Sequence, residues 1–214
     1  MALSKVDYNS LNVTAAASKA LKWNSDADGF ETGDIGGSLV LLETQTASSS
    51  ATIDFTSNID DTYDEYVFKF YDIHPSADIT FGFQVDTGTN TSYNQTITST
   101  TFRAYHDEAD GDTSLGYASG DDQAQGSAMQ PIALISTSND DSASGELWIF
   151  NPSSSVFVKH FIATSNGVKA LSGQYSYNMF TAGYINTTTA ITRVQFKTSS
   201  GNIDAGVIKM YGVS

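Results

Sequence analysis

The chain has 214 residues, of which 24 are acidic, 10 are lysine or arginine and none is cysteine, and its formal net charge is −14. This charge argues against binding to nucleic acids, which requires a basic surface that displaces counterions. It also disfavours anionic membrane surfaces, and no apolar run approaches the length of a membrane span. We therefore expect no nucleic-acid partner, no membrane insertion, no disulfide and no cysteine chemistry.

Residues 1–36 differ in composition from the rest of the chain, and we interpret them as an arm followed by a β-hairpin. The arm is polar with scattered apolar residues, and the segment ALKWNSDADGFETG (Ala20–Gly33) carries the turn signal Asp28-Gly29. An isolated hairpin is marginal in water, so its large apolar side chains need a partner surface, either on their own sandwich or on another subunit. The docking or oligomer contacts that we expect are Leu11, Val13, Leu21, Trp23 and Phe30.

Residues 37–214 consist of short segments in which apolar and polar residues alternate, as DITFGFQV (Asp78–Val85) shows best. A period of two is typical of a strand with one buried face and one solvated face, so Gln84 is expected to face water. The predicted strands are Ser38–Gln45, Ala51–Phe55, Glu65–Asp72, Asp78–Val85, Thr101–Tyr105, Pro131–Thr137, Gly145–Asn151, Val158–Thr164, Tyr175–Tyr184, Ile191–Thr198 and Ala205–Val213. No fixed repeat or helical period is present, which predicts an all-β, antiparallel, jelly-roll-like β-sandwich.

The longest gap between predicted strands is His106–Gln130, which is acidic and rich in glycine and is interpreted as a functional or partly disordered loop. Its first residues resemble the opening of a calcium loop, but Gly111 falls one place early and no acidic residue closes the loop. A solvated acidic loop is favoured over a calcium site, so no metal is predicted. The residues of this loop that we expect to contact a partner are His106, Asp107, Glu108, Asp110 and Asp112.

The sequence offers little for catalysis. The three histidines are isolated from one another, and no nucleophile elbow or phosphate-binding loop is present. Asp64, Glu65 and Glu146 are the candidate acids of a glycosidase, but strand-end acids facing solvent are the more common case. Trp148, in ELWIF, is expected in the core. We predict no catalytic residue, no cofactor and no enzymatic activity.

Several segments carry a family resemblance, most specifically the closing FKTSSGNIDAGVIKMYGVS, together with FRAYHDEADGDTSLGY and FNPSSSVFVKHFIATS. In these segments the chain resembles the C-terminal domain of tail-fibre-like virion proteins of marine bacteriophages. The segment Asn12–Gly33 is similar to the hairpin linkers that precede this domain. The resemblance implies a structural protein of the virus particle, a homotrimer with a jelly-roll-like head and an N-terminal segment that docks to other virion proteins.

These observations predict two parts, a virion-docking arm and hairpin at 1–36 and a sandwich at 37–214. The expected function is that of a short tail fibre or spike-type adhesin, which attaches to a host-surface glycan or protein through its loops. A capsid decoration protein and a lectin-like or carbohydrate-active module remain as alternatives. The first residues lack the basic start and apolar core of a signal peptide, so we expect synthesis in the host cytoplasm and assembly into the virion.

Overall fold

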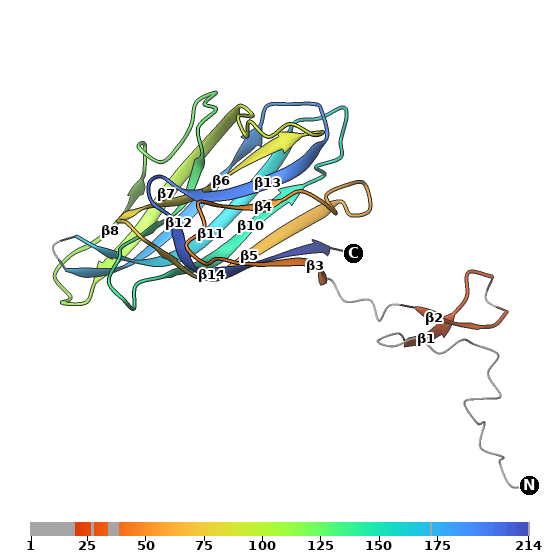
Figure 1. The fold of residues 1–214 in the computed structure, drawn as a ribbon, viewed down its shortest axis with the longest axis horizontal. Coiled ribbons are helices and arrows are strands. Elements are labelled where there is room, and N and C mark those ends of the chain that lie inside the picture. Colours follow the sequence, from red (N-terminus) through yellow and green to blue (C-terminus); the bar gives the residue numbers. More distant parts are fainter. Residues whose placement is uncertain (1–19, 27, 34–38, 172, 214) are drawn as a thin grey trace, which may run out of the picture. The chain divides into compact units, whose positions relative to one another are not determined.

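The computed structural model describes residues 20–26, 28–33, 39–171 and 173–213. The chain divides into two units, 1–38 and 39–214, two residues from the predicted boundary. In the described residues of both units, every regular element is a strand (Figure 1). The prediction of an all-β, antiparallel sandwich is confirmed.

The first unit contains a two-stranded hairpin of β1 (Ala20–Trp23) and β2 (Phe30–Gly33). Trp23 lies opposite Phe30 in the register, and their rings stack with centroids 4.4 Å apart. On the other face of the hairpin, Lys22 pairs with Glu31 at 3.3 Å. The predicted contact residues Leu11 and Val13 lie outside the described residues.

The second unit is built from one large and one small antiparallel sheet. The eight-stranded sheet has the order β3 (Leu39–Thr46), β14 (Ile203–Val213), β5 (Glu65–Pro75), β10 (Ala143–Phe150), β11 (Lys159–Ala170), β12 (Gln174–Ile185), β7 (Ile97–Asp107) and β8 (Thr113–Tyr117). The four-stranded sheet has the order β4 (Thr52–Phe55), β13 (Ile191–Thr198), β6 (Ile79–Thr87) and β9 (Gln130–Ile135). Figure 1 shows β4, β13 and β6 crossing in front of the large sheet.

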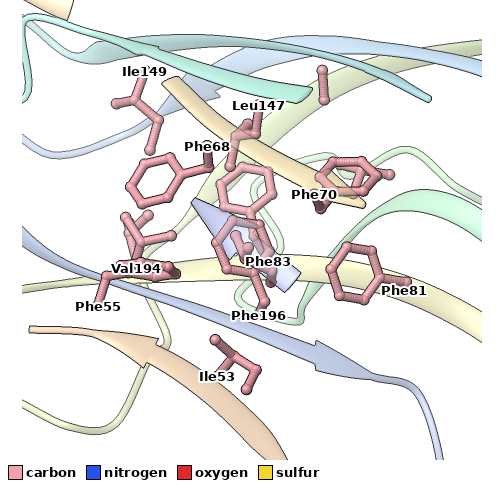
Figure 2. Packing of buried hydrophobic residues seen from close by; sticks show 14 of the residues in the cluster. Ile53, Phe55, Phe68, Phe70, Phe81, Phe83, Leu147, Ile149, Val194 and Phe196 are labelled. Atoms are coloured by element: carbon pink, nitrogen blue, oxygen red, sulfur yellow. The ribbon is translucent and has the colours of Figure 1, made fainter. Parts of the chain in front are cut away.

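The core lies between the two sheets and is rich in phenylalanine, because inward positions alternate along every strand. Phe55 of the small sheet meets Phe68 of the large sheet edge to face, with ring centroids 5.2 Å apart. Phe83 meets Phe161 in the same way at 5.0 Å. Figure 2 shows this meeting of side chains from β5 and β10 with side chains from β4, β6 and β13. All four of these rings are almost completely buried.

Strand β6 of the small sheet is covered on both faces, which corrects the expectation that Gln84 faces water. Gln84 and Asp86 are fully buried although they point away from the phenylalanine core. The Gln84 amide donates to the carbonyl oxygens of Gln95, Ser127 and Ala128 at 2.9–3.1 Å. The second face of β6 is therefore buried as well, and its polar side chains form hydrogen bonds with the backbone of the segments that cover it.

The predicted loop His106–Gln130 is largely ordered by backbone pairing, so its interpretation as one long loop is wrong. Strand β7 continues to Asp107, and β8 returns along it as a hairpin. The chain then runs back beside the start of β7, where Gly126 exchanges two backbone hydrogen bonds with Ile97 at 2.7 and 3.0 Å. Buried amide and hydroxyl groups hold the remainder: Ser99 donates to Gln130, and Gln130 donates to the Asp121 carbonyl.

Candidate functional site

The candidate site is the outer face of the eight-stranded sheet, meaning the side turned away from the four-stranded sheet. Side chains on this face alternate along each strand with those of the core, and residues opposite each other in the register share a face. The exposed large apolar residues that it carries are Leu39, Leu41, Tyr71, Phe102, Leu115, Tyr117 and Ile162. Most of the large apolar side chains that are exposed in the second unit lie here.

An apolar row crosses seven of the eight strands on this outer face. Its members lie opposite one another in consecutive strand pairs: Leu41, Tyr211, Val67, Trp148, Ile162, Ala182 and Thr100. Leu41 is 54 % exposed at one end, while Trp148 and Ile162 occupy the middle. Cross-strand neighbours of this kind stabilise a sheet. Val67 within the row is fully buried, while the other members are partly or fully exposed, so the row brings apolar side chains to the surface on both sides of Val67.

Aromatic rings gather at the β8 end of the outer face. Phe102 on β7 stacks on Phe180 of β12, with ring centroids 4.9 Å apart and planes inclined by 20°. Tyr117 lies opposite Phe102 in the register and is 59 % exposed. Two positions along β8, Leu115 is 74 % exposed. This end therefore presents large rings and an aliphatic side chain to solvent.

Four charged side chains near the apolar row of the outer face balance one another. Glu146 pairs with Lys69 at 3.5 Å, and Lys209 lies over the ring of Tyr71, 5.7 Å from its centroid. Glu65 is the second carboxylate near the row.

Further carboxylates lie beyond the row. Strand β5 also carries the exposed Asp72, and the hydroxyl of Tyr117 donates to the Asp122 carboxylate. The outer face is therefore balanced in charge near the row and acidic toward these positions, in a chain whose net charge is −14.

Shallow hollows occur on the same face. One, of about 410 Å³, lies over β7, β12 and β11 and is lined by Phe150, Ile162, Ala182 and Tyr184 together with Thr98 and Thr100. A second hollow, of about 380 Å³, lies beside Lys69, Tyr71 and Glu146. The surface is therefore uneven enough to receive protruding side chains of a partner.

The predicted acidic residues form the tip of the β7–β8 hairpin, where they hold their own turn. The Asp107 carboxylate accepts hydrogen bonds from the backbone N–H groups of Gly111 and Asp112 at 2.7 and 2.9 Å. These bonds, that of Asp112 first, lower the pKa of Asp107. The side chain of Asp112 accepts a bond from Tyr175, and that of Asp110 lies 3.0 Å from the His106 ring.

This turn gives the acidic residues a structural role without bringing them together around a cation. Glu108 contributes its backbone N–H, which donates to the Gln174 carbonyl. Among the residues that the structure describes, no three His, Asp or Glu side chains converge in a way that could hold a metal ion. The tip remains exposed, and its role as a host contact stays a prediction.

The hairpin of the first unit brings its three predicted contact residues to one face. Leu21 and Trp23 are two positions apart on β1, and Phe30 lies opposite Trp23. All three are exposed within the described residues, Trp23 by 61 %. The arrangement gives a small apolar surface, and its part in docking or oligomerisation stays a prediction.

An ion pair and a buried lysine lie on the inner side of the large sheet. Arg103 pairs with Asp121 at 3.5 Å and lies over the ring of Tyr177. Burial raises the pKa of Asp121, although the neighbouring guanidinium opposes this effect. Lys159 is fully buried and donates to the Thr187 carbonyl at 3.1 Å, and burial lowers its pKa. These bonds tie connecting segments to the sheet.

Sequence reasoning missed the outer face because alternation does not distinguish the two faces of a sheet, and it assigned Trp148 to the core. Trp148 is half-buried on the outer face, opposite Ile162, which corrects its expected core position. Leu147 and Ile149, its neighbours in the chain, are the core residues of β10. The signal was present: strands that are apolar at consecutive positions, as in ELWIF, are typical of sheets covered on both faces.

Comparison of the sequence with models of protein families gave no match, and comparison with curated proteins gave no significant match. Over the described ranges, no helix has the length and apolar character that crossing a membrane requires.

Proposed function

We propose that this protein is a non-enzymatic structural component of a bacteriophage virion, a short tail fibre or spike-type adhesin. The observation that carries the proposal is the outer face, where an apolar row and balanced charges beside it lie on an otherwise acidic sandwich. A surface of this composition suits lasting contact with another protein. The resemblance of the closing segment to tail-fibre-like virion proteins supplies the biological setting.

We further propose that eight of the strands form a jelly roll. When the hairpins β7–β8 and β11–β12 are set aside, the remaining strands have the orders β3-β14-β5-β10 and β4-β13-β6-β9. The chain then passes back and forth between two four-stranded sheets, in the manner of the double Greek key of a jelly roll. The two hairpins extend one sheet to eight strands and thereby create most of the outer face.

In this proposal the arm and hairpin dock to other virion proteins and support a homotrimer. Trp23 and Phe30 give the hairpin an apolar surface that symmetric association would bury. The β7–β8 tip, with its exposed acidic residues, is the proposed contact with a host-surface glycan or protein. Hairpin tips on a rigid sheet are a common place for binding residues.

The test of this function is the position and copy number of the protein in purified particles whose genome encodes it. Quantitative mass spectrometry and antibody labelling in electron micrographs are expected to place a low number of copies on the tail. A copy number comparable to that of the capsid protein, with labels on the capsid, would instead establish the decoration alternative. Absence from the particle would refute both proposals.

A further inference from the structure

We propose that two copies of this chain pack against each other through the outer face of the eight-stranded sheet. The inference concerns the isolated protein and goes beyond the proposed role in a virion. The occupant of the face is a second copy of the same surface, which makes the contact isologous. Four observations support this choice: the area of the face, its charge, its apolar row and the position of that row.

The area of the face matches what a stable dimer needs. Eight strands spaced about 4.8 Å apart, with strands of about 30 Å in length, give a surface of about 1,000 Å². A standard protein–protein interface buries about 800 Å² on each partner. One sheet face can therefore supply a complete interface.

The charge of the face favours a second copy over a charged partner. Two chains that each carry −14 repel each other over most of their surfaces. Near the apolar row of the outer face, Glu65 and Glu146 are balanced by Lys69 and Lys209, so contact centred on the row adds little repulsion. A basic partner, by contrast, would find its complement on the remaining acidic surface.

The composition of the face is that of an interface between identical subunits, which is more apolar than the rest of a protein surface. The apolar row runs from Leu41 to Thr100 without a charged residue. Phe102, Leu115 and Tyr117 continue the apolar surface to the edge of the sheet.

The row is also placed for twofold symmetry. The middle of the sheet lies between β10 and β11, where Trp148 and Ile162 are opposite each other. An axis through this point brings the same two side chains of both copies together, while the ends of each face contact the opposite ends of the other. Two twisted sheets packed in this way cross at about 30°.

The experiment is sedimentation equilibrium of the full-length chain at micromolar concentrations, with matched lysine variants. Ile162→Lys introduces a charge at the centre of the proposed contact, and Thr100→Lys introduces one at an exposed position of the same row. Phe157→Lys is the control, because Phe157 is 71 % exposed in the connection between β10 and β11, outside the strands. Circular dichroism establishes that each variant is folded.

We expect Ile162→Lys and Thr100→Lys each to halve the molecular mass of the sedimenting protein, and we expect Phe157→Lys to leave that mass unchanged. If Ile162→Lys fails to fold, Thr100→Lys decides, since it removes no buried carbon. A second full-length variant, Trp23→Lys with Phe30→Lys, separates this contact from association through the hairpin and is expected to retain the dimer.

The proposal is wrong if the wild-type chain is a monomer, if folded Thr100→Lys keeps the wild-type mass, or if the hairpin variant alone produces monomers. A dimer that forms by pairing of the free edges of β8 would also contradict the proposal. Such a dimer would persist in both Ile162→Lys and Thr100→Lys. These outcomes are independent of the virion proposal, because a face-to-face dimer found in solution leaves the position of the protein on a particle to its own test.

Discussion

The side chain of Gln84 holds the connection before β9 against the small sheet: its side-chain nitrogen lies 3.0 Å from the carbonyl oxygen of Ala128 and 3.1 Å from that of Ser127. Gln84 is fully buried, so its amide has no contact with bulk water and depends on these carbonyl groups as acceptors. The contact explains why the connection before β9 is ordered although it contains little regular structure.

Substituting Gln84→Leu should therefore destabilise the sandwich. Carbonyl groups of the covering segment lose this donor, although that of Ala128 keeps a second donor in the Gln123 amide. An acceptor left without a partner at a buried contact costs about 1–3 kcal/mol, so we expect a loss of about 2 kcal/mol in the free energy of unfolding. Urea denaturation measures this loss, and hydrogen exchange should show faster exchange at residues 123–128. Gln45→Leu is the control, since Gln45 bonds only within β3 among the contacts of its side chain that the structure describes. Equal stability of the two variants would contradict the prediction.

The β7–β8 turn should open in acid. The pKa of Asp107 is lowered in the closed turn, first by the N–H of Asp112 and also by that of Gly111. A carboxylate with a lowered pKa stabilises the closed turn above its ordinary pKa of about 3.9, and this contribution is lost as the pH falls through the lower value. We expect the amide exchange of Gly111 and Asp112, corrected for intrinsic rates, to accelerate in that range.

Asp107→Asn is the control for the acid opening, because the amide oxygen can still accept hydrogen bonds but does not titrate. The corrected exchange at Gly111 should then be independent of pH across the same range. A pH dependence that persists in this variant would show that Asp107 does not cause the opening.

Lys159 should reduce stability at neutral pH. Its charged form is disfavoured by burial, so its pKa is lowered, and the cost is present below that pKa and disappears as the pH rises toward the ordinary value of about 10.4. We expect Lys159→Met to stabilise the protein by about 1 kcal/mol at pH 7, after the lost bond to the Thr187 carbonyl is taken into account.

The difference in stability between Lys159→Met and the wild type should shrink between pH 7 and pH 10. Comparing the two proteins cancels the ionisation of tyrosines, which they share. Urea unfolding at both pH values provides the measurement. A variant less stable than the wild type at pH 7 would show that the buried lysine contributes more through its hydrogen bond than burial costs.

Trp23→Ala should leave the unfolding temperature of the sandwich unchanged while it weakens attachment to virions. This follows from the proposal that the stacked pair of Trp23 and Phe30 docks on another protein. Differential scanning calorimetry and a pull-down with purified particles measure the two effects, and Lys22→Ala on the opposite face of the hairpin is the control. A clear drop in the unfolding temperature would indicate that the hairpin packs on its own sandwich.

Much of the sandwich could be predicted from alternation. Each of the eleven predicted strands corresponds to a strand of the second unit, since positions such as Phe81 and Phe83 carry the signal of a buried face directly. Strand β8 was missed because five exposed residues at the edge of a sheet give almost no hydrophobic pattern. The alternation of apolar and polar residues predicts a strand, but it does not determine whether a given apolar residue lies on the inner or the outer face of the sheet.

That ambiguity explains both errors about individual residues. Gln84 reads as solvent-facing, and its burial depends on a segment more than forty residues away that supplies carbonyl groups. The sequence predicts a core position for Trp148, whereas its position on the outer face follows from its register with Ile162 and Val67. The outer face forms only when the eight strands take their order in the large sheet. Contacts between segments far apart in the sequence determine that order.

Hydroxyl-radical footprinting of the wild-type chain as a function of its concentration tests most directly whether two copies pack through the outer face. Phe102, Tyr117 and Ile162 on the outer face are compared with Phe157, an exposed internal reference away from it. We predict that oxidation of the three outer-face residues falls as the concentration rises, while that of Phe157 stays constant. Oxidation of all four residues that is independent of concentration, in a protein that sediments as a monomer, would contradict the claim.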